Sequence, residues 1–486
     1  MTEEIPAAAS NPRAEAASAA ALQTGARLVI LLLGLALMIY LTRHLGRGEY
    51  GQYAVAMVLM SWLSVFVAVA TTSTTIRLVA GHADGQAYAA AILRAVAFFT
   101  ICLAALVAVF AQTLADAFRS PQIAPLLQIL CLDLVLTSIA GIYSSILVAQ
   151  RRFLASSLAI VSGAATQLGA AFLLVGHGWL AAGACAASVA GSATQLIIGR
   201  AATGLPIINR DRADLAPLWR YARLLAGTSL ALRITQSMDL LAVKFFTRSS
   251  LPAGAYAGGQ NISLAAMTLF LPSSGIVLQS MAQSQKKGQH AEAVRTGTLF
   301  LRVALTYGAL LGALSARADD IVALLLGPAF SSSGPVLAIL LWAVAFRTLS
   351  VAGNCFIAAT GKSPSIIAAL LVLVALGVAA YAIVVPSYGT EGAAWVALAL
   401  AATAGIASLR EGLRLTGISF PWTSLLRIGL AATGAAVTTS LLPAGGLLLL
   451  PNLIGACLAY MLALYALNEW RPGGKEFSAL RAAFNR

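Results

Sequence analysis

Charged side chains interrupt long segments of this chain that are otherwise strongly apolar. No P-loop of the form GxxxxGK[ST], no paired acids and no nucleophile motif is present, and the four His do not cluster. The residues that could do chemistry are the charges inside the apolar segments, namely Arg27, Arg233, Arg302, Arg347, Arg427, Asp133 and Asp239. A charge at the centre of a bilayer costs about 2.5–3.5 kcal/mol, so we expect these side chains to face a shared polar space or one another.

The deep arginines are candidates for binding an anion. Arg233 and Arg347 lie near the middle of the apolar segments 218–246 and 333–359, where the guanidinium group does not easily reach the membrane surface. Arg binds phosphate and carboxylate through paired hydrogen bonds. Arg27 and Arg302 belong to the same candidate set, although each starts its segment and could simply extend to the surface. The sequence favours an interfacial anchor for Arg427.

The two acids inside the apolar segments allow two interpretations. Asp133 and Asp239 could exchange a proton or bind Na⁺, or they could form static salt bridges with the deep arginines. Arg77 and Arg223 lie at cytoplasmic segment ends, where topology alone explains them, and they are also candidates for a cavity gate. Pro272 and Gly275 fall near the middle of segment 255–281 and predict a kink or break that could act as a hinge.

The elements that must position these residues are membrane-spanning helices. The chain is 59% hydrophobic and 10% charged, with a mean hydropathy of +0.87, whereas soluble domains contain about 25% charged residues. Apolar runs long enough to cross a bilayer recur along the whole chain. We therefore expect an all-α polytopic membrane protein, and we do not read the net charge of +14 as a sign of nucleic-acid binding. The predicted spans are 24–42, 50–73, 91–114, 122–149, 153–175, 179–199, 218–246, 255–281, 297–316, 333–359, 364–385, 391–409, 423–442 and 447–468.

The basic residues predict the orientation of these spans. With fourteen crossings and a cytoplasmic N-terminus, most of the 31 Lys and Arg lie on the cytoplasmic side, as the positive-inside rule requires. Both termini are then cytoplasmic. The acidic, Ala-rich residues 1–20 predict a disordered cytoplasmic tail rather than a signal peptide, and residues 471–486 predict a second tail.

An internal repeat organises the chain into halves. The segment Pro125–Leu130 recurs as Pro335–Leu340, and Gly51–Ala54 is echoed by Gly254–Ala257. The repeat predicts an N-terminal six-helix lobe (21–205), a C-terminal six-helix lobe (206–412) and two extra helices (413–470). Transporters built from repeats commonly bind their substrate between the halves and work by alternating access.

Several segments, in order and spacing, resemble a known family. They are Leu45–Ala54, Asp239–Leu241, Gly254–Ala257, Leu325–Phe330 and Ala359–Lys362. Over roughly residues 20–410 the chain resembles the polysaccharide and oligosaccharide flippases of the multidrug/oligosaccharidyl-lipid/polysaccharide exporter superfamily. The resemblance implies a bacterial inner-membrane protein, not an enzyme, that flips an undecaprenyl-pyrophosphate-linked oligosaccharide to the outer leaflet. Its pyrophosphate would be held by Arg in a cationic cavity between the lobes.

The resemblance also implies the partners and leaves alternatives open. The expected partners are the lipid-linked oligosaccharide and membrane lipids, with a polysaccharide polymerase and a chain-length regulator as further candidates. No cofactor is expected beyond H⁺ or Na⁺ as coupling ion. The alternative functions are a lipid II flippase and a multidrug/cation antiporter of the same superfamily. A membrane-embedded glycosyltransferase or ligase is disfavoured because the longest outer segment, near 317–332, carries only Asp319 and Asp320 as acids.

Overall fold

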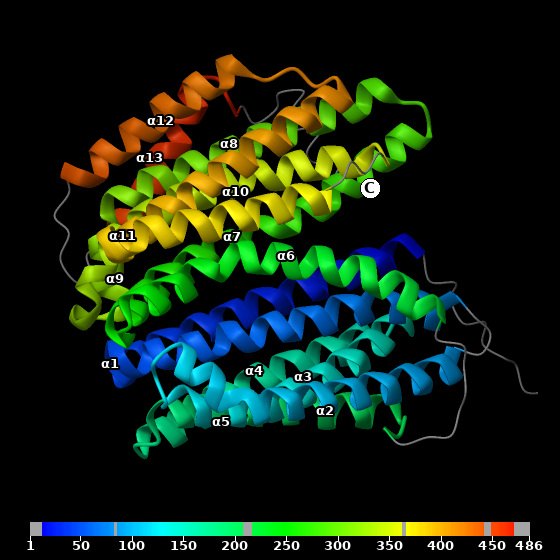
Figure 1. The fold of residues 1–486 in the computed structure, drawn as a ribbon. Helices are drawn as coiled ribbons and strands as arrows, with labels where there is room; N and C mark the ends of the chain where they lie inside the picture. The colour runs from blue at the N-terminus through cyan, green and yellow to red at the C-terminus, as the bar shows by residue number, and fades with distance from the viewer. Residues whose placement is uncertain (1–11, 82–84, 208–215, 362–365, 442–448, 471–486) are drawn as a thin grey trace, which may run out of the picture. The chain divides into compact units, whose positions relative to one another are not determined.

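The protein is helical throughout the part of the chain that the structure describes. The computed structural model describes residues 12–81, 85–207, 216–361, 366–441 and 449–470, which form thirteen α-helices and two short 3-10 helices (Figure 1). In chain order these are α1 (Pro12–Gly81), α2 (Gly85–Ala117), α3 (Ile123–Ala149), α4 (Phe153–Gly176), α5 (Leu180–Thr203), α6 (Ala216–Thr247), α7 (Ser250–Lys286), α8 (His290–Leu314), η1 (Ser315–Arg317), α9 (Ala318–Leu326), η2 (Pro328–Ser333), α10 (Gly334–Ala359), α11 (Ile366–Thr416), α12 (Trp422–Leu441) and α13 (Leu449–Ala466).

Two of the helices are interrupted by a single glycine. In α1 the backbone leaves helical geometry at Gly46 (φ 67°, ψ 174°), and in α11 it does so at Gly389 (φ 57°, ψ −135°). A positive φ is strained for residues with a Cβ, so glycine suits both positions. The breaks fall between the span pairs that the sequence predicts, 24–42 with 50–73 and 364–385 with 391–409. At both places, the loop expected between two spans is a direct junction of two helices at a single non-helical glycine.

Eleven helical stretches in the described residues are long and apolar enough to cross a membrane. The stretches in α1 and α11 span 44 and 48 residues, and a bilayer crossing needs about 20. Helix α6 is not among the eleven, because it carries Arg233, Asp239 and Lys244 in its second half. The all-α, polytopic membrane class expected from the composition is confirmed.

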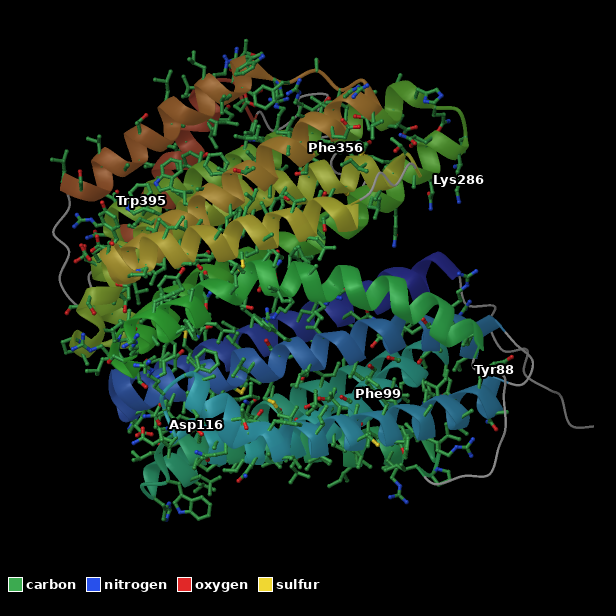
Figure 2. All side chains as sticks on the ribbon, in the orientation of Figure 1. Tyr88, Phe99, Asp116, Lys286, Phe356 and Trp395 are labelled. Carbon is green, nitrogen blue, oxygen red and sulfur yellow. The ribbon has the colours of Figure 1, made fainter. Side chains whose placement is uncertain are left out.

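Many large apolar side chains lie on the outside of the helices. Val109, Ile383 and Leu441 are 75%, 75% and 79% exposed. In Figure 2 the labelled Trp395 of α11 is likewise exposed, whereas Phe356 of α10 is fully buried beside Phe300. So much exposed apolar surface is unusual in a water-soluble monomer and suits contact with lipid chains.

The helices form two compact units whose limits differ from the predicted lobes. The first unit contains α1 up to Leu41 and then Leu59–Asp116 and Ser120–Leu230, and the second contains Thr42–Val58, Ala117–Arg119 and the chain from Ala231 onward. The boundary therefore falls inside α6 rather than in the polar connection before it. The boundary between the units lies where residues stop contacting one unit and start contacting the other. A polar loop shows only where the chain reaches water.

Two differences from the sequence-based expectation concern the ends of elements. Helix α1 begins at Pro12, inside the stretch 1–20 that the sequence predicts to be a disordered tail. Proline fits the first turn of a helix, and the alanines that follow have the highest helix propensity. Residues 317–332, which lie between two predicted spans, are largely helical, because α9 and η2 occupy most of them. The predicted tails 1–11 and 471–486 lie outside the described residues.

The two copies of the repeat occupy equivalent positions in two helices. Pro125 is the third residue of α3 and Pro335 the second of α10, and these helices end at Ala149 and Ala359. The aliphatic positions match as well, since Leu127 and Leu337 are both fully buried. The repeated sequence therefore forms a helix with matching ends and matching buried positions in each unit, α3 in the first and α10 in the second.

The second repeated segment forms a close helix contact within the second unit. A Cβ on Gly51 would lie 2.2 Å from the carbonyl oxygen of Ser250, and a Cβ on Gly254 would lie 1.8 Å from that of Arg47. Around it, Asn261 Nδ2 donates to the Tyr50 hydroxyl at 2.7 Å. Small residues allow such backbone approach between membrane helices.

The motif segments that carry the family resemblance meet at the same contact. Arg43 Nη2 donates to the Leu324 carbonyl at 2.6 Å, and Arg47 Nη1 donates to Ser332 Oγ at 3.1 Å. The Tyr50 ring packs edge-on against Phe330, with centroids 5.8 Å apart. The motif 45–54 therefore joins α1 to α7 and η2, and the adjacent Arg43 adds the bond to α9.

We predict that Gly51→Ala and Gly254→Ala each destabilise the protein by about 1–3 kcal/mol, because the added methyl group must displace backbone atoms. The measurement is the thermal unfolding midpoint of the purified protein in detergent. Gly275→Ala is the matched control, since a Cβ there meets no atom within 4 Å. Equal midpoints for all three variants would contradict the close contact.

Candidate substrate-binding site

A buried polar cluster in the second unit surrounds Asp239. Its side chain comes from α6 and is 1% exposed. Tyr256 of α7 donates its hydroxyl to Oδ2 at 2.8 Å, and Gln260 Nε2, one helical turn further, donates to Oδ1 at 2.6 Å. The backbone N–H of Leu240 also donates to Oδ1 at 2.9 Å. Such a set of donors stabilises a carboxylate inside an apolar protein.

Two arginines supply positive charge to this cluster. Arg347 of α10 interacts electrostatically with Asp239, and Arg233 of α6 does so as well. Both arginines are partly buried. The Arg347 guanidinium makes no hydrogen bond to any residue within the described ranges. Its donors are therefore available for an anionic ligand, and two cations around one carboxylate leave a net positive charge.

The cluster is closed from a fourth helix. Tyr381 of α11 is 2% exposed and interacts electrostatically with both Asp239 and Arg347. Helices α6, α7, α10 and α11 therefore each contribute a polar side chain to one site within the second unit. This arrangement agrees with the interpretation that the deep arginines and Asp239 belong together.

Arg302 lies in a different environment. Its Nε donates to Glu469 Oε1 at 2.7 Å, and its Nη2 donates to the Glu469 backbone carbonyl at 2.7 Å. The guanidinium carbon also lies 5.3 Å from the centre of the Trp470 ring. Arg302 thus fixes the end of α13 against α8. The structure shows it paired with Glu469 and not placed beside Arg233 and Arg347.

Glu469 also has a second basic neighbour. Arg427 Nη1 of α12 lies 3.7 Å from Glu469 Oε2, and the Glu469 side chain is fully buried. The Tyr460 hydroxyl of α13 donates to the Thr306 carbonyl of α8 at 2.9 Å. These bonds attach the extra pair α12–α13 to the second unit, and the interfacial anchor that the sequence favours for Arg427 stays a prediction.

Within the described residues, the hydrogen-bond partners of Asp133 are hydroxyl groups. In the first unit, Ser192 Oγ of α5 donates to Asp133 Oδ1 at 2.6 Å, and Thr137 Oγ1 lies 3.4 Å from the same oxygen. Ser188 provides a further side-chain hydrogen bond. No Arg or Lys in the described part of the chain forms an ion pair with Asp133. The salt bridge that the sequence allows is absent here.

The remaining predicted residues are spread along three helices. Arg27 and Arg77, both on α1, are exposed. Arg223 lies in α6, and its side chain is outside the described residues. Helix α7 continues without a break through Pro272 and Gly275, so the predicted break is not observed and the hinge role stays a prediction. Ser273 and Ser274 donate to the carbonyls of Phe270 and Leu271, bonds that strengthen the turn around the proline.

An apolar pocket of about 460 Å³ lies on the second unit between α8, α10 and α12. Among its lining residues, two have a polar group in the side chain: Thr433 with its hydroxyl and Trp342 with its indole N–H. The lining is made mainly of small and aliphatic residues: Ala304, Leu305, Gly308, Ala309, Gly312, Ala313, Trp342, Ala345, Phe346, Leu349, Leu425, Ile428, Gly429, Ala432, Thr433 and Ala436. Such a surface fits a hydrocarbon chain and offers almost nothing to a sugar.

Sequence reasoning missed several partners. Glu469 was not recognised, because nothing in the sequence links it to an arginine 167 residues away. The hydroxyl groups around Asp133 were also missed, although the spacing of Ser188 and Ser192 puts both on one face of α5. Gln260 of α7 bonds Asp239 of α6, and this contact between two helices leaves no pattern within either helix.

The helical membrane fold defines a polytopic membrane protein whose fold is similar to that of MOP superfamily transporters. Among solved structures, the lipid II flippase MurJ in an inward closed conformation aligns with a TM-score of 0.73 at 16% identity, covering 91% of this chain and 98% of that chain. An inward-facing multidrug resistance MATE family transporter aligns with a TM-score of 0.63 at 12% identity, covering 82% and 98%. A MOP superfamily transporter from Pyrococcus furiosus aligns at 0.59 and 14%, covering 83% and 95%.

The model of the polysaccharide biosynthesis protein family matches residues 18–279, more than half of the chain. The chain belongs to this family, which confirms the resemblance seen in its sequence motifs. A comparison with curated protein sequences gives no significant match. The protein is therefore a polytopic membrane protein of the polysaccharide biosynthesis family, with a fold similar to that of MurJ and the MATE transporters.

We predict that Arg302→Gln lowers the stability of the protein by about 3–5 kcal/mol, because it leaves the buried Glu469 carboxylate without its main partner. Thermal unfolding in detergent measures the effect. The double variant Arg302→Gln/Glu469→Gln should recover much of the loss, since an amide pair carries no unpaired charge. Additive losses in the double variant would argue against the pair.

Proposed function

We propose that this protein flips an undecaprenyl-pyrophosphate-linked oligosaccharide from the inner to the outer leaflet of a bacterial inner membrane. The head group of such a lipid is large, polar and anionic, and crossing hydrocarbon unaided would be very costly. The family match to polysaccharide biosynthesis proteins supports this class of cargo. A polymerase and a chain-length regulator would act on the flipped product.

The proposed topology has fourteen crossings and two cytoplasmic termini. Helices α1 and α11 each cross twice, on either side of Gly46 and Gly389, and the polar helix α6 crosses once. The short α9 stays at one surface. Two six-helix lobes then account for residues 21–205 and 206–412, with α12 and α13 as the extra pair.

The observation that carries the proposal is the excess of guanidinium charge around Asp239. Arg347, with no hydrogen bond to the described residues, and Arg233 are suited to bind a pyrophosphate through paired N–H groups. Residual positive charge in a low-dielectric site attracts an anion and repels an organic cation. This argument favours a lipid-linked anion over the cargo of a multidrug/cation antiporter.

The apolar pocket between α8, α10 and α12 supports a lipid-tailed cargo. A site for a polyprenyl carrier must accept a long hydrocarbon chain as well as an anionic head group. The pocket and the cluster around Arg347 belong to the same unit, and α10 contributes residues to both. A lipid II flippase is the second candidate, because it would need the same two chemistries and the MurJ fold is similar.

In this proposal the transporter works by alternating access through a cationic cavity. Arg27 would add positive charge to it, Arg77 and Arg223 would line its cytoplasmic mouth, and Pro272 with Gly275 would allow α7 to bend. An H⁺ or Na⁺ gradient would supply direction, since the chain has no ATP-binding motif.

We predict that Arg347→Ala lowers export about 10- to 100-fold, the equivalent of losing a charge-assisted hydrogen bond of 1.5–3 kcal/mol. Surface polysaccharide and accumulated lipid-linked oligosaccharide are measured in the source bacterium with its own gene deleted and the variant supplied. Arg233→Ala should act in the same direction.

Arg414→Ala is the control for charge, because its side chain is 80% exposed and, within the described residues, its ion pair is with the neighbouring Glu411 at 3.7 Å. Export should stay at the level of the unmodified protein. Normal export by both Arg347→Ala and Arg233→Ala, at equal protein levels in the membrane, would remove the anion-binding role.

We also predict that Gly429→Leu reduces export several-fold by filling the apolar pocket. A Cβ at Gly429 meets no atom within 4 Å, so the larger side chain extends into the pocket without displacing the backbone. Gly434→Leu is matched to it, on the same helix and equally unobstructed, but outside the pocket. Unchanged export for Gly429→Leu would show that the pocket does not hold the lipid tail.

A further inference from the structure

The two acids inside the apolar helices have chemically different partners. Asp239 receives hydrogen bonds from an amide, a backbone N–H and a phenol and lies near two arginines. Asp133 is surrounded by the hydroxyl groups of Thr137, Ser188 and Ser192. The contrast matters because these groups differ in whether they can both donate and accept.

An amide or guanidinium N–H can only donate, so it suits a carboxylate and not the O–H of a carboxylic acid. A hydroxyl group can rotate and either donate to a carboxylate or accept from a carboxylic acid. The backbone N–H of Leu240 can only donate, and the two nearby arginines are positively charged, so these groups favour the charged form of Asp239. The surroundings of Asp133 provide hydrogen bonds for both protonation states.

The arrangement of the hydroxyls supports this exchange. Thr137 Oγ1 and Ser192 Oγ lie 2.6 Å apart, and either oxygen can be the donor. Ser192 Oγ is in turn 2.6 Å from Asp133 Oδ1. The three oxygens thus form a continuous chain whose direction can reverse. A metal cation bound between these oxygens would first have to push them apart, whereas a proton needs no additional space.

The electrostatic surroundings of Asp133 contain little compensating charge. Helix α4 of the first unit carries no ionisable side chain. Among the described residues, the ionisable group that interacts electrostatically with Asp133 is the Cys185 thiol of α5. The other ionisable groups on α3 and its neighbours include Cys131, Tyr143, Arg77, Arg94, Asp116 and Arg200. Protonation is therefore the available way to neutralise this carboxylate.

We propose that Asp133 is the proton-exchanging residue that couples this transporter to a proton gradient, an inference that rests on the proposed lipid flipping. The carboxylate takes a proton from a hydronium ion on the outer side, giving a carboxylic acid and water. Ser192 rotates from donor to acceptor as this O–H forms. In the inward-open state the acid returns the proton to water on the cytoplasmic side, and Ser192 donates again.

Infrared difference spectroscopy of the purified protein in lipid tests the protonation directly. On acidification, the unmodified protein and Asp239→Asn should both gain the carbonyl stretch of a buried carboxylic acid, and Asp133→Asn should lack it. Asp133→Glu, which keeps a titrating group, should regain a shifted band. An unchanged band in a folded Asp133→Asn protein, or no buried acid band in the unmodified protein, would overturn the proposal.

Transport in proteoliposomes tests the coupling with a fluorescent undecaprenyl-pyrophosphate-linked sugar as probe. If one proton is exchanged for each probe molecule, a pH gradient of one unit allows up to about tenfold accumulation of the probe. Asp133→Asn should retain exchange without a gradient and lose the accumulation. Equal accumulation by this variant, or accumulation driven by a Na⁺ gradient instead, would refute the role of Asp133. Failure of the unmodified protein to move the probe at all would instead refute the proposed cargo, and the infrared result would still stand.

Discussion

The cost of placing charge in hydrocarbon governs the polar sites of this protein. Each charge inside an apolar helix must find a partner within reach, because water is not there to solvate it. The described residues show three solutions: Asp239 with N–H and O–H donors and nearby arginines, Arg302 with Glu469, and Asp133 with hydroxyl groups. These solutions differ in whether they fix the charge permanently or allow it to change.

Close packing of small residues is the second constraint. Hydrophobicity does not hold helices together when lipid surrounds them, so van der Waals contact and interhelical hydrogen bonds must do so. The contact of Gly51 with Gly254 and the hydrogen bond from Asn261 to Tyr50 combine both. As a result, a short piece of α1 belongs to the second unit. Motif residues that mark the family therefore have a packing function.

The second unit combines two chemistries that an amphiphilic lipid requires. Helix α10 provides Arg347 to the charged cluster and Trp342, Ala345, Phe346 and Leu349 to the apolar pocket. Positive charge suits an anionic head group, and a surface of small aliphatic residues suits its hydrocarbon tail. Helix α12 forms one wall of the pocket, and the ion pair of Arg427 with Glu469 attaches it to the segment that follows α13.

Sequence alone determined the helical membrane class, most helix positions and the family, because hydropathy, propensity and motif spacing are local properties. It also selected the deep arginines with Asp133 and Asp239 as possible partners, since few charges occur in apolar spans. Only the tertiary structure decided that Arg302 pairs with Glu469 and that Asp133 has hydroxyl partners. Contacts between residues far apart in the chain depend on how the helices pack. The sequence pattern within one helix does not indicate which helix packs against it.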